Sequence, residues 1–254
     1  MGELSDRQKA YEIKYDLRIC CYEYFLIRLD GKGFSKRIKK WHCDKPFDRW
    51  FYEAMCDATK ALMEEIPDIK LAWTGSDEIT ILFHNKTGDG WYSNRINKLL
   101  SLTASIATAK FNSSLYKIHQ EIPEKYDTFE YPAWFDSRII TPPDLVECLN
   151  NIVYRQQDCI RNSISIWFAK FYSHKQSMNL NGDEKIQKMI NEQNFDWNIN
   201  ASHWTKFGTL FYYVKKEFIN EDQISYIRNV LYNDSNKYTG TLLLKYLNGE
   251  IDNE

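Results

Sequence analysis

The amino-acid sequence predicts an α+β protein in which helices pack on an antiparallel sheet. Short apolar runs alternate with segments of helical periodicity, in the order strand, helix, hairpin, helix, strand, helix. Two of the strands, residues 69–73 and 79–84, are separated by only five residues, which favours a hairpin. No internal repeat or low-complexity linker divides the chain. We therefore expect a single domain over residues 1–254, with a core over residues 20–215 and a C-terminal extension over residues 216–254.

The individual elements follow from local patterns. Residues 48–65 repeat apolar side chains at helical spacing, and Pro67 ends that helix. Residues 24–29 (YFLIRL) form an apolar run that ends at the turn residues Asp30 and Gly31. The expected helices cover residues 5–17, 48–65, 91–116, 145–171 (one or two helices) and 184–192, and the expected strands cover residues 24–29, 69–73, 79–84, 137–141 and 209–215.

Composition places the chain among globular proteins, because 43% of its 254 residues are hydrophobic and can form a sizeable core. The net charge of −2 gives no global sign of a nucleic-acid-binding protein. The six cysteines form no CxxC pair, so they fit neither a zinc site nor a disulfide framework. They indicate reduced thiols and a cytoplasmic location, with an organelle as the alternative. The N-terminal segment lacks an apolar signal-peptide core, and no apolar run approaches the roughly 18 residues of a membrane helix.

Two acidic turns are the most informative local feature. Asp30 follows an apolar strand and precedes Gly31, and Asp77 lies in the turn between two further strands. Mg²⁺ prefers oxygen ligands and usually takes one or two carboxylates together with substrate phosphates. If the two strand ends lie side by side, the two carboxylates and the Gly31 carbonyl form a site for one or two Mg²⁺ ions. Taken singly, each aspartate is also an ordinary turn or cap residue.

Basic residues surround the first acidic turn. Residues 28–49 contain eight lysines and arginines against three aspartates. Such a run is either a solvated surface or a phosphate-binding one, and its place beside a metal site would favour the second. Lys45, Arg95 and Lys98 are the candidates for neutralising a triphosphate, while the glycines of the first turn would let backbone N–H groups approach it. The lysines of residues 36–40 serve either solubility or contact with an RNA backbone.

Several motifs resemble those of the tRNA(His) guanylyltransferase superfamily, and in particular its guanylyltransferase-like 3′–5′ polymerase branch. They are residues 28–34 (RLDGKGF), 45–48 (KPFD), 75–78 (GSDE), Arg95 and Lys98, 135–138 (FDSR), 155–159 (RQQDC) and 206–209 (KFGT). The motifs occur in the same order as in that superfamily and span roughly residues 24–214. Together they are specific, although each one alone is common.

The resemblance implies a palm-like sheet of the kind found in 5′–3′ polymerases, assembled into a homotetramer. It implies two Mg²⁺ ions held by Asp30, the Gly31 carbonyl and Asp77. It further implies an ATP- or GTP-binding segment made of the first turn and the hairpin tip: Asp30, Gly31, Lys32, Gly33, Phe34, Ser35, Ser76 and Asp77. Lys45, Arg95 and Lys98 would help to activate the 5′ end of a tRNA, which the 3′-hydroxyl of an incoming nucleotide then attacks.

One departure from the eukaryotic pattern bears on the substrate. Eukaryotic relatives carry a His-Ile-Asn-Asn run that is tied to reading the tRNA(His) anticodon, whereas this chain has residues 160–163 (IRNS). The resemblance therefore implies templated repair of 5′-truncated tRNA, with guanylate addition to tRNA(His) as the alternative. Candidates for tRNA binding on this helix are Arg155, Arg161, Asn162 and Ser163, although the spacing of its polar residues fits a buried polar network equally well.

Two other interpretations stay open. A Gly-Ser-Asp-Glu hairpin is also similar to that of palm-type nucleotidyl cyclases, although a cyclase leaves Arg95 and Lys98 unexplained. A tRNA-binding protein without activity could use the same fold, and the intact pair Asp30 and Asp77 argues against it.

Overall fold

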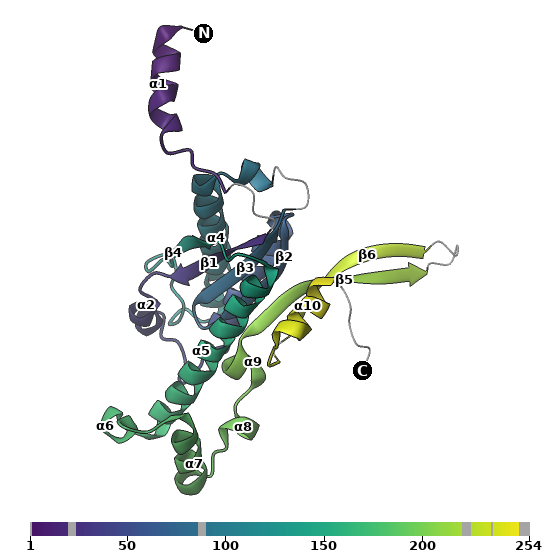
Figure 1. Ribbon diagram of the computed structural model, residues 1–254. Coiled ribbons are helices and arrows are strands. Elements are labelled where there is room, and N and C mark those ends of the chain that lie inside the picture. The colour runs from purple at the N-terminus through teal and green to yellow at the C-terminus, as the bar shows by residue number, and fades with distance from the viewer. Residues whose placement is uncertain (1, 20–23, 86–89, 220–224, 235, 249–254) are drawn as a thin grey trace.

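The computed structural model describes residues 2–19, 24–85, 90–219, 225–234 and 236–248, and it has the expected α+β architecture (Figure 1). Antiparallel strands form one six-stranded sheet in the order β4-β1-β3-β2-β5-β6. The strands are β1 (Tyr24–Gly31), β2 (Ile69–Gly75), β3 (Glu78–His84), β4 (Phe135–Ile140), β5 (Thr209–Ile219) and β6 (Ser225–Asp234).

The helices of the described residues largely follow the predicted order. They are α1 (Glu3–Ile13), α2 (Phe34–Lys40), α3 (Arg49–Glu65), η1 (Trp91–Asn94), α4 (Ile96–Glu121), α5 (Leu145–Phe171), α6 (His174–Ser177), α7 (Gly182–Gln193), α8 (Trp197–Asn200), α9 (His203–Phe207) and α10 (Gly240–Asn248). The helix expected over residues 91–116 starts later, because the short 3-10 helix η1 precedes α4.

The sheet carries a separate core on each face. Helices α3 and α4 pack on one face against Leu29 and Ile81, whereas α5 and α10 pack on the other face against Leu26 and Trp73. Successive side chains of a strand alternate between the two faces. Asp30 therefore shares the α5 face with Leu26, four residues earlier on β1.

The two ends of the molecule differ in packing. The C-terminal half of α5 packs with α7 and α8 around a third core that includes Phe168, Met189 and Trp197. Helix α1 lies at the opposite end and buries none of its residues (Figure 1). Helix α9 lies against both α5 and β2, and Trp73 Nε1 donates a hydrogen bond of 3.0 Å to the Phe207 carbonyl, which places α9 near the β2–β3 hairpin.

The C-terminal part of the chain contributes to the core, and the sequence did not predict this. Strand β5 runs through the boundary expected at residues 215–216 and pairs with β6. Tyr238 and Leu243 are buried in the same core as Leu149 of α5. Residues 225–234 (SYIRNVLYND) lack a clear apolar–polar alternation. Their pairing with β5, and not a pattern of their own, makes them a strand.

Four cysteines lie within the described residues. Cys43, Cys56, Cys148 and Cys159 are free thiols. The adjacent Cys20 and Cys21 lie outside the described residues. In the part of the chain that the structure describes, none of the helices combines the length and the apolar character that crossing a bilayer requires.

Candidate active site

The tip of the β2–β3 hairpin presents Asp77. Strand β2 ends at Gly75 and β3 begins at Glu78, so the loop has two residues, Ser76 and Asp77, and is shorter than the expected five. Ser76 has a φ of 56°, the left-handed conformation that two-residue hairpin loops require. The Thr74 hydroxyl donates a hydrogen bond of 2.8 Å to the Glu78 carbonyl and closes the turn. Asp77 is therefore fixed on a rigid support.

The end of β1 places Asp30 beside this tip. Asp30 lies directly opposite Glu78 in the β1–β3 pair, and the Gly31 N–H donates a hydrogen bond of 3.0 Å to the Asp77 carbonyl. That hydrogen bond joins the two acidic turns. The prediction that the two turns meet is confirmed, and the Gly31 carbonyl stays a candidate ligand.

The charges at this junction are suited to a divalent cation. Burial, reinforced by the negative charge of Asp30, raises the pKa of Asp77 to about 6. The Ser76 hydroxyl, 3.2 Å from Asp77, and the Arg138 guanidinium, 3.9 Å from Asp30, compensate only part of this repulsion. Among the described residues, no three His, Cys, Asp or Glu side chains are grouped to hold a metal. Two carboxylates and the Gly31 carbonyl fit Mg²⁺, which completes its coordination with phosphates and water.

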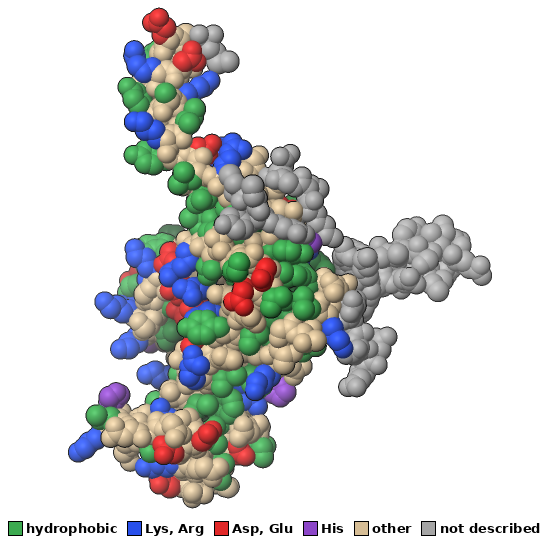
Figure 2. Space-filling model, viewed as in Figure 1, with side chains coloured by type: hydrophobic (Ala, Val, Ile, Leu, Met, Phe, Trp, Pro, Cys, Tyr) green, Lys and Arg blue, Asp and Glu red, His purple; other side chains and the backbone are tan. Residues whose placement is uncertain are grey.

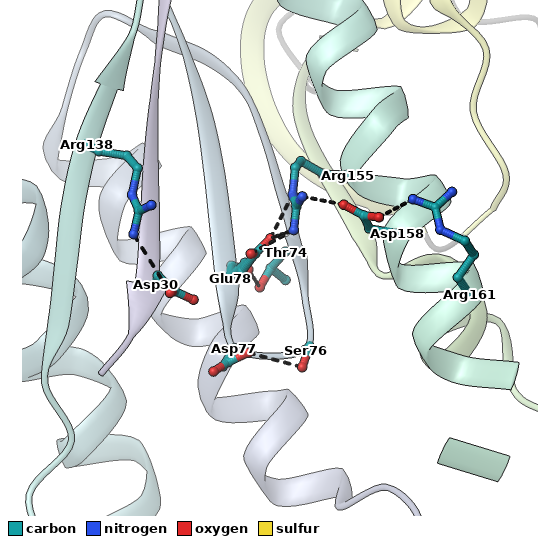
Figure 3. A network of polar contacts seen from close by, with 9 residues as sticks. All are labelled: Asp30, Thr74, Ser76, Asp77, Glu78, Arg138, Arg155, Asp158 and Arg161. Atoms are coloured by element: carbon teal, nitrogen blue, oxygen red, sulfur yellow. Dashed lines mark hydrogen bonds and ion pairs between the residues drawn. The ribbon is translucent and has the colours of Figure 1, made fainter. Parts of the chain in front are cut away.

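A chain of ion pairs ties α5 to the hairpin (Figure 3). Arg155 Nη2 donates to both carboxylate oxygens of Glu78, at 2.7 and 2.6 Å, and Arg155 Nε donates to one of them at 2.9 Å. Asp158 accepts hydrogen bonds from Arg155 and Arg161. The four charges alternate in sign from Glu78 to Arg161. The polar network that was one interpretation of this helix is therefore present.

A cavity of about 130 Å³ opens beside the hairpin tip, between the loop before α3, the hairpin, α5 and α9. Its lining is largely apolar and includes the rings of Phe47, Tyr52 and Trp204. Tyr52 and Trp204 stack with ring centroids 4.3 Å apart. Ser76 and Asn162 line both this cavity and a smaller one of about 60 Å³ that reaches Asp77 and Glu78. An apolar pocket that opens toward acidic residues can hold a nucleobase while its phosphates lie at the metal site.

The structure separates the three basic residues that the sequence grouped together. Lys45 is exposed in the loop next to Pro46, which lines the cavity. Lys98 is exposed on α4, and α4 packs on the face of the sheet opposite Asp30. Arg95 precedes α4, and its Nε donates a hydrogen bond of 2.5 Å to Asp16. Within one chain, Arg95 and Lys98 therefore do not join the carboxylates.

The expected nucleotide-binding segment is only partly available to a ligand. Lys32, Gly33 and Ser35 are exposed. Phe34, in contrast, is buried, and its ring contacts the aromatic core formed by Trp41, Phe51, Phe111 and Phe135. The Phe34 side chain holds α2 against the core, so only the Phe34 backbone is open to a ligand, and its place in the nucleotide-binding segment stays a prediction.

The four tRNA-binding candidates on α5 also divide into two groups. Ser163 is buried, and its hydroxyl accepts a hydrogen bond of 3.1 Å from Trp197 Nε1. Arg155 is engaged by Glu78 and Asp158. Both side chains have partners within the chain, and RNA contact by them stays a prediction. Arg161 and Asn162 are exposed and remain candidates.

Four exposed lysines lie beside the first acidic turn. Figure 2 shows lysine and arginine side chains gathered on the side of the molecule that carries α2. We call Lys32, Lys36, Lys39 and Lys40, all exposed, the α2 lysines. Lys40 lies over the ring of Tyr131, with its Nζ 4.9 Å from the centroid. This surface adjoins Asp30, which precedes Lys32 by two residues. The Lys32 N–H donates a hydrogen bond to the carbonyl of Trp134, the residue before β4.

Gly31 is required by close packing at the junction. An added methyl group would lie 2.6 Å from the buried ring of Phe34, which has no room to move. Because overpacking costs about 1–3 kcal/mol, we expect Gly31→Ala to lower the melting temperature measured by calorimetry. Gly182→Ala is the matched control, since its methyl group would meet Ile164 at an ordinary 3.6 Å. Equal melting temperatures for the two variants would show that Gly31 is not closely packed.

An antiparallel sheet with two adjoining carboxylates at its end and a nucleobase-sized cavity beside them defines a palm-type nucleotidyltransferase. Residues 5–143 match the profile of the tRNAHis guanylyltransferase family. The chain belongs to the tRNA(His) guanylyltransferase family.

Individual relatives agree with this assignment. The tRNA(His) guanylyltransferase of Debaryomyces hansenii is 31% identical over 175 residues, which cover 69% of this chain and 63% of that protein. A bacterial tRNA(His) guanylyltransferase-like protein, solved in complex with ATP, superposes with a TM-score of 0.73 at 32% identity, covering 89% of this chain and 92% of that one. A structure of such a bacterial protein with GTP gives a TM-score of 0.69 at 30% identity, covering 92% of each chain.

Sequence reasoning missed the cavity and the partner of Glu78. The cavity is assembled from segments that lie far apart in the chain, among them Phe47, Ile166 and Trp204. Apolar residues of this kind look like ordinary core residues in a sequence. The available signal was the set of motifs 45–48, 75–78, 155–159 and 206–209, because each contributes at least one residue to the lining of the cavity.

Proposed function

We propose that this protein adds nucleotides to the 5′ end of tRNA in the 3′–5′ direction and repairs 5′-truncated tRNA against its opposite strand as template. The observation that carries this proposal is the junction of Asp30 and Asp77 at the end of the sheet, beside a cavity suited to a nucleobase. The run of residues 160–163 (IRNS) has no histidine and supports repair over maturation of tRNA(His).

In this proposal ATP or GTP places its base in the cavity and its phosphates at the carboxylates. The ATP and GTP complexes of the bacterial relatives support a nucleotide site in this fold. Asp30, Asp77 and the Gly31 carbonyl would hold two Mg²⁺ ions, which when bound offset phosphate charge and lower the pKa of an attacking hydroxyl.

The remaining groups of the chain position the reactants. The short hairpin loop holds Asp77 in place, and the Ser76 hydroxyl lies between the cavity and the carboxylates. Lys45, at the rim of the cavity, would neutralise the phosphates during activation of the 5′ end. The apolar walls exclude water from the base, which leaves the acidic edge of the pocket for the phosphates.

We further propose that a homotetramer brings Arg95 and Lys98 of one protomer to the Asp30 and Asp77 carboxylates of another. Within one protomer α4 packs on the sheet face opposite to the face that carries Asp30, so its own basic residues do not reach the site. Lys98→Ala and Asp77→Asn should then each be inactive alone and regain activity when mixed and reassembled. Random pairing would restore about one site in four. If nucleotide addition by the mixture stays at background, Lys98 of one protomer does not act at the carboxylates of another.

The α2 lysines would contact the RNA backbone of the acceptor stem. Lys36→Gln/Lys39→Gln should weaken tRNA binding and flatten the dependence of log Kd on log salt by about one unit for each phosphate that the variant no longer neutralises. ATP affinity should not change. Lys110→Gln/Lys117→Gln removes the same charge from exposed positions of α4. If both pairs weaken tRNA binding equally in a salt titration, the effect is one of net charge and not of this surface.

The function is tested with labelled tRNAs that lack the first 5′ nucleotide and differ in the opposing base. Incubation with Mg²⁺, ATP and all four nucleoside triphosphates should extend each tRNA by the complementary nucleotide. If the protein adds only guanylate, and only to tRNA(His), the repair proposal is wrong and the protein is a tRNA(His) guanylyltransferase in the strict sense. The name of the Debaryomyces relative favours that alternative. Formation of a cyclic nucleotide without RNA would indicate a cyclase and contradict both.

A further inference from the structure

Glu78 occupies a position from which it could be a third metal ligand. It lies directly opposite Asp30 in the β1–β3 pair, and directly opposite residues place their side chains on the same face of a sheet, about 5 Å apart at Cβ. It also follows Asp77 in the chain. Sequence and register alone would therefore give the site three carboxylates.

The carboxylate of Glu78 is already engaged. Its two oxygens accept three hydrogen bonds of 2.6–2.9 Å from Arg155, and the two side chains are only 18% and 13% exposed. The remaining contact of Arg155 goes to Asp158, which also pairs with Arg161. Figure 3 shows the Glu78 side chain directed to Arg155 of α5, whereas the Asp77 carboxylate extends from the hairpin tip toward the side of β1, which carries Asp30.

We propose that Arg155 is a positioning residue that holds Glu78 out of metal coordination, so that the site has two carboxylate ligands and not three. The inference rests on the proposed Mg²⁺ site at Asp30 and Asp77. A third carboxylate would bind the cation more tightly, because affinity rises with the number of charged ligands. It would also cancel positive charge that is needed by the triphosphate and occupy a coordination position that a phosphate oxygen takes.

The experiment measures binding of Mn²⁺ alone to the full-length protein, by the loss of the electron paramagnetic resonance signal of the free ion. The variants form a cycle: wild type, Arg155→Met, Glu78→Gln and the double variant Arg155→Met/Glu78→Gln. Removing Arg155 also removes a nearby positive charge, which by itself favours a cation. The Glu78→Gln background measures that through-space effect separately, because no carboxylate is released there.

We expect Arg155→Met to tighten Mn²⁺ binding at least about fivefold relative to wild type. In the Glu78→Gln background the same substitution should change Mn²⁺ affinity by less than about twofold. The Michaelis constant for ATP should rise in Arg155→Met and return toward the Glu78→Gln value in the double variant. Equal changes in Mn²⁺ affinity in both backgrounds, or no tightening, would overturn the proposal.

Two further measurements keep the test decisive. If Arg155→Met fails to fold, as circular dichroism would show, Arg155→Gln replaces it in both backgrounds under the same criterion. Asp30→Asn/Asp77→Asn is titrated in parallel. If Asp30→Asn/Asp77→Asn loses Mn²⁺ binding while Arg155→Met has the same effect in the wild-type and Glu78→Gln backgrounds, only this inference is overturned. If Asp30→Asn/Asp77→Asn still binds Mn²⁺, the proposed metal site itself is overturned.

Discussion

Replacing either Asp30 or Asp77 by asparagine is expected to lower the rate of nucleotide addition on the order of 10³-fold, or about 4 kcal/mol of transition-state stabilisation. In the proposed metal site, each variant removes one of only two charged oxygen ligands, since no larger group of acidic, histidine or cysteine side chains is present among the described residues. The rate is measured on a 5′-truncated tRNA at saturating ATP and Mg²⁺. The melting temperature of Asp77→Asn should equal or exceed that of wild type, because burial and the Asp30 charge already disfavour the ionised side chain.

Asp136→Asn is the matched control for these variants. Asp136 lies opposite Asp30 in the β1–β4 pair, so it shares the same face, but it is exposed and pairs with Arg138 at 3.1 Å. It should lose less than about tenfold in rate. If Asp136→Asn is as inactive as Asp77→Asn, the acidic face as a whole matters and the assignment of two particular ligands is wrong.

Filling the cavity is expected to be the second large effect. Cys43 lines the cavity, and a phenyl ring in its place would occupy the space next to Phe47 and Tyr52. We expect Cys43→Phe to raise the Michaelis constants for ATP and GTP at least about tenfold, equivalent to about 1.4 kcal/mol of binding. Mn²⁺ binding at Asp30 and Asp77 should stay unchanged, since the carboxylates lie outside the apolar pocket.

Cys43→Ser controls for loss of the thiol, which takes part in no disulfide. It keeps the size of the side chain and should leave the Michaelis constants within about twofold of wild type. Isothermal titration with ATP and with triphosphate alone separates base from phosphate binding. Should Cys43→Phe weaken triphosphate as much as ATP, the base does not lie in this cavity.

The predicted fold was recovered because the strands that carry the site have strong local patterns. Strand β1 is an apolar run that ends at Asp30, and the β2–β3 hairpin is closed by a two-residue loop. Both are decided by residues near in sequence. Strand β6 was missed because its strand conformation depends on pairing with β5, which the sequence pattern of residues 225–234 does not encode.

The candidate site was predictable at its acidic centre and not at its periphery. The meeting of Asp30 and Asp77 was predictable because each follows a strong strand pattern, and pairing of these strands brings their ends together. Arg95 and Lys98 share a helix start and a charge, but a sequence does not tell which face of the sheet that helix covers. The engagement of Glu78 by Arg155 joins residues 77 positions apart, so no local pattern could reveal it.

The two-carboxylate metal site is tested most directly by the anomalous X-ray signal of Mn²⁺ in crystals of the protein grown with ATP. We expect the Mn²⁺ peaks at the Asp30 and Asp77 carboxylates and the Gly31 carbonyl, with the adenine ring in the cavity lined by Phe47 and Trp204. Glu78 should remain on Arg155. Peaks that lie at Asp136 or Glu78 without Asp77, or a base outside the cavity, would contradict this assignment.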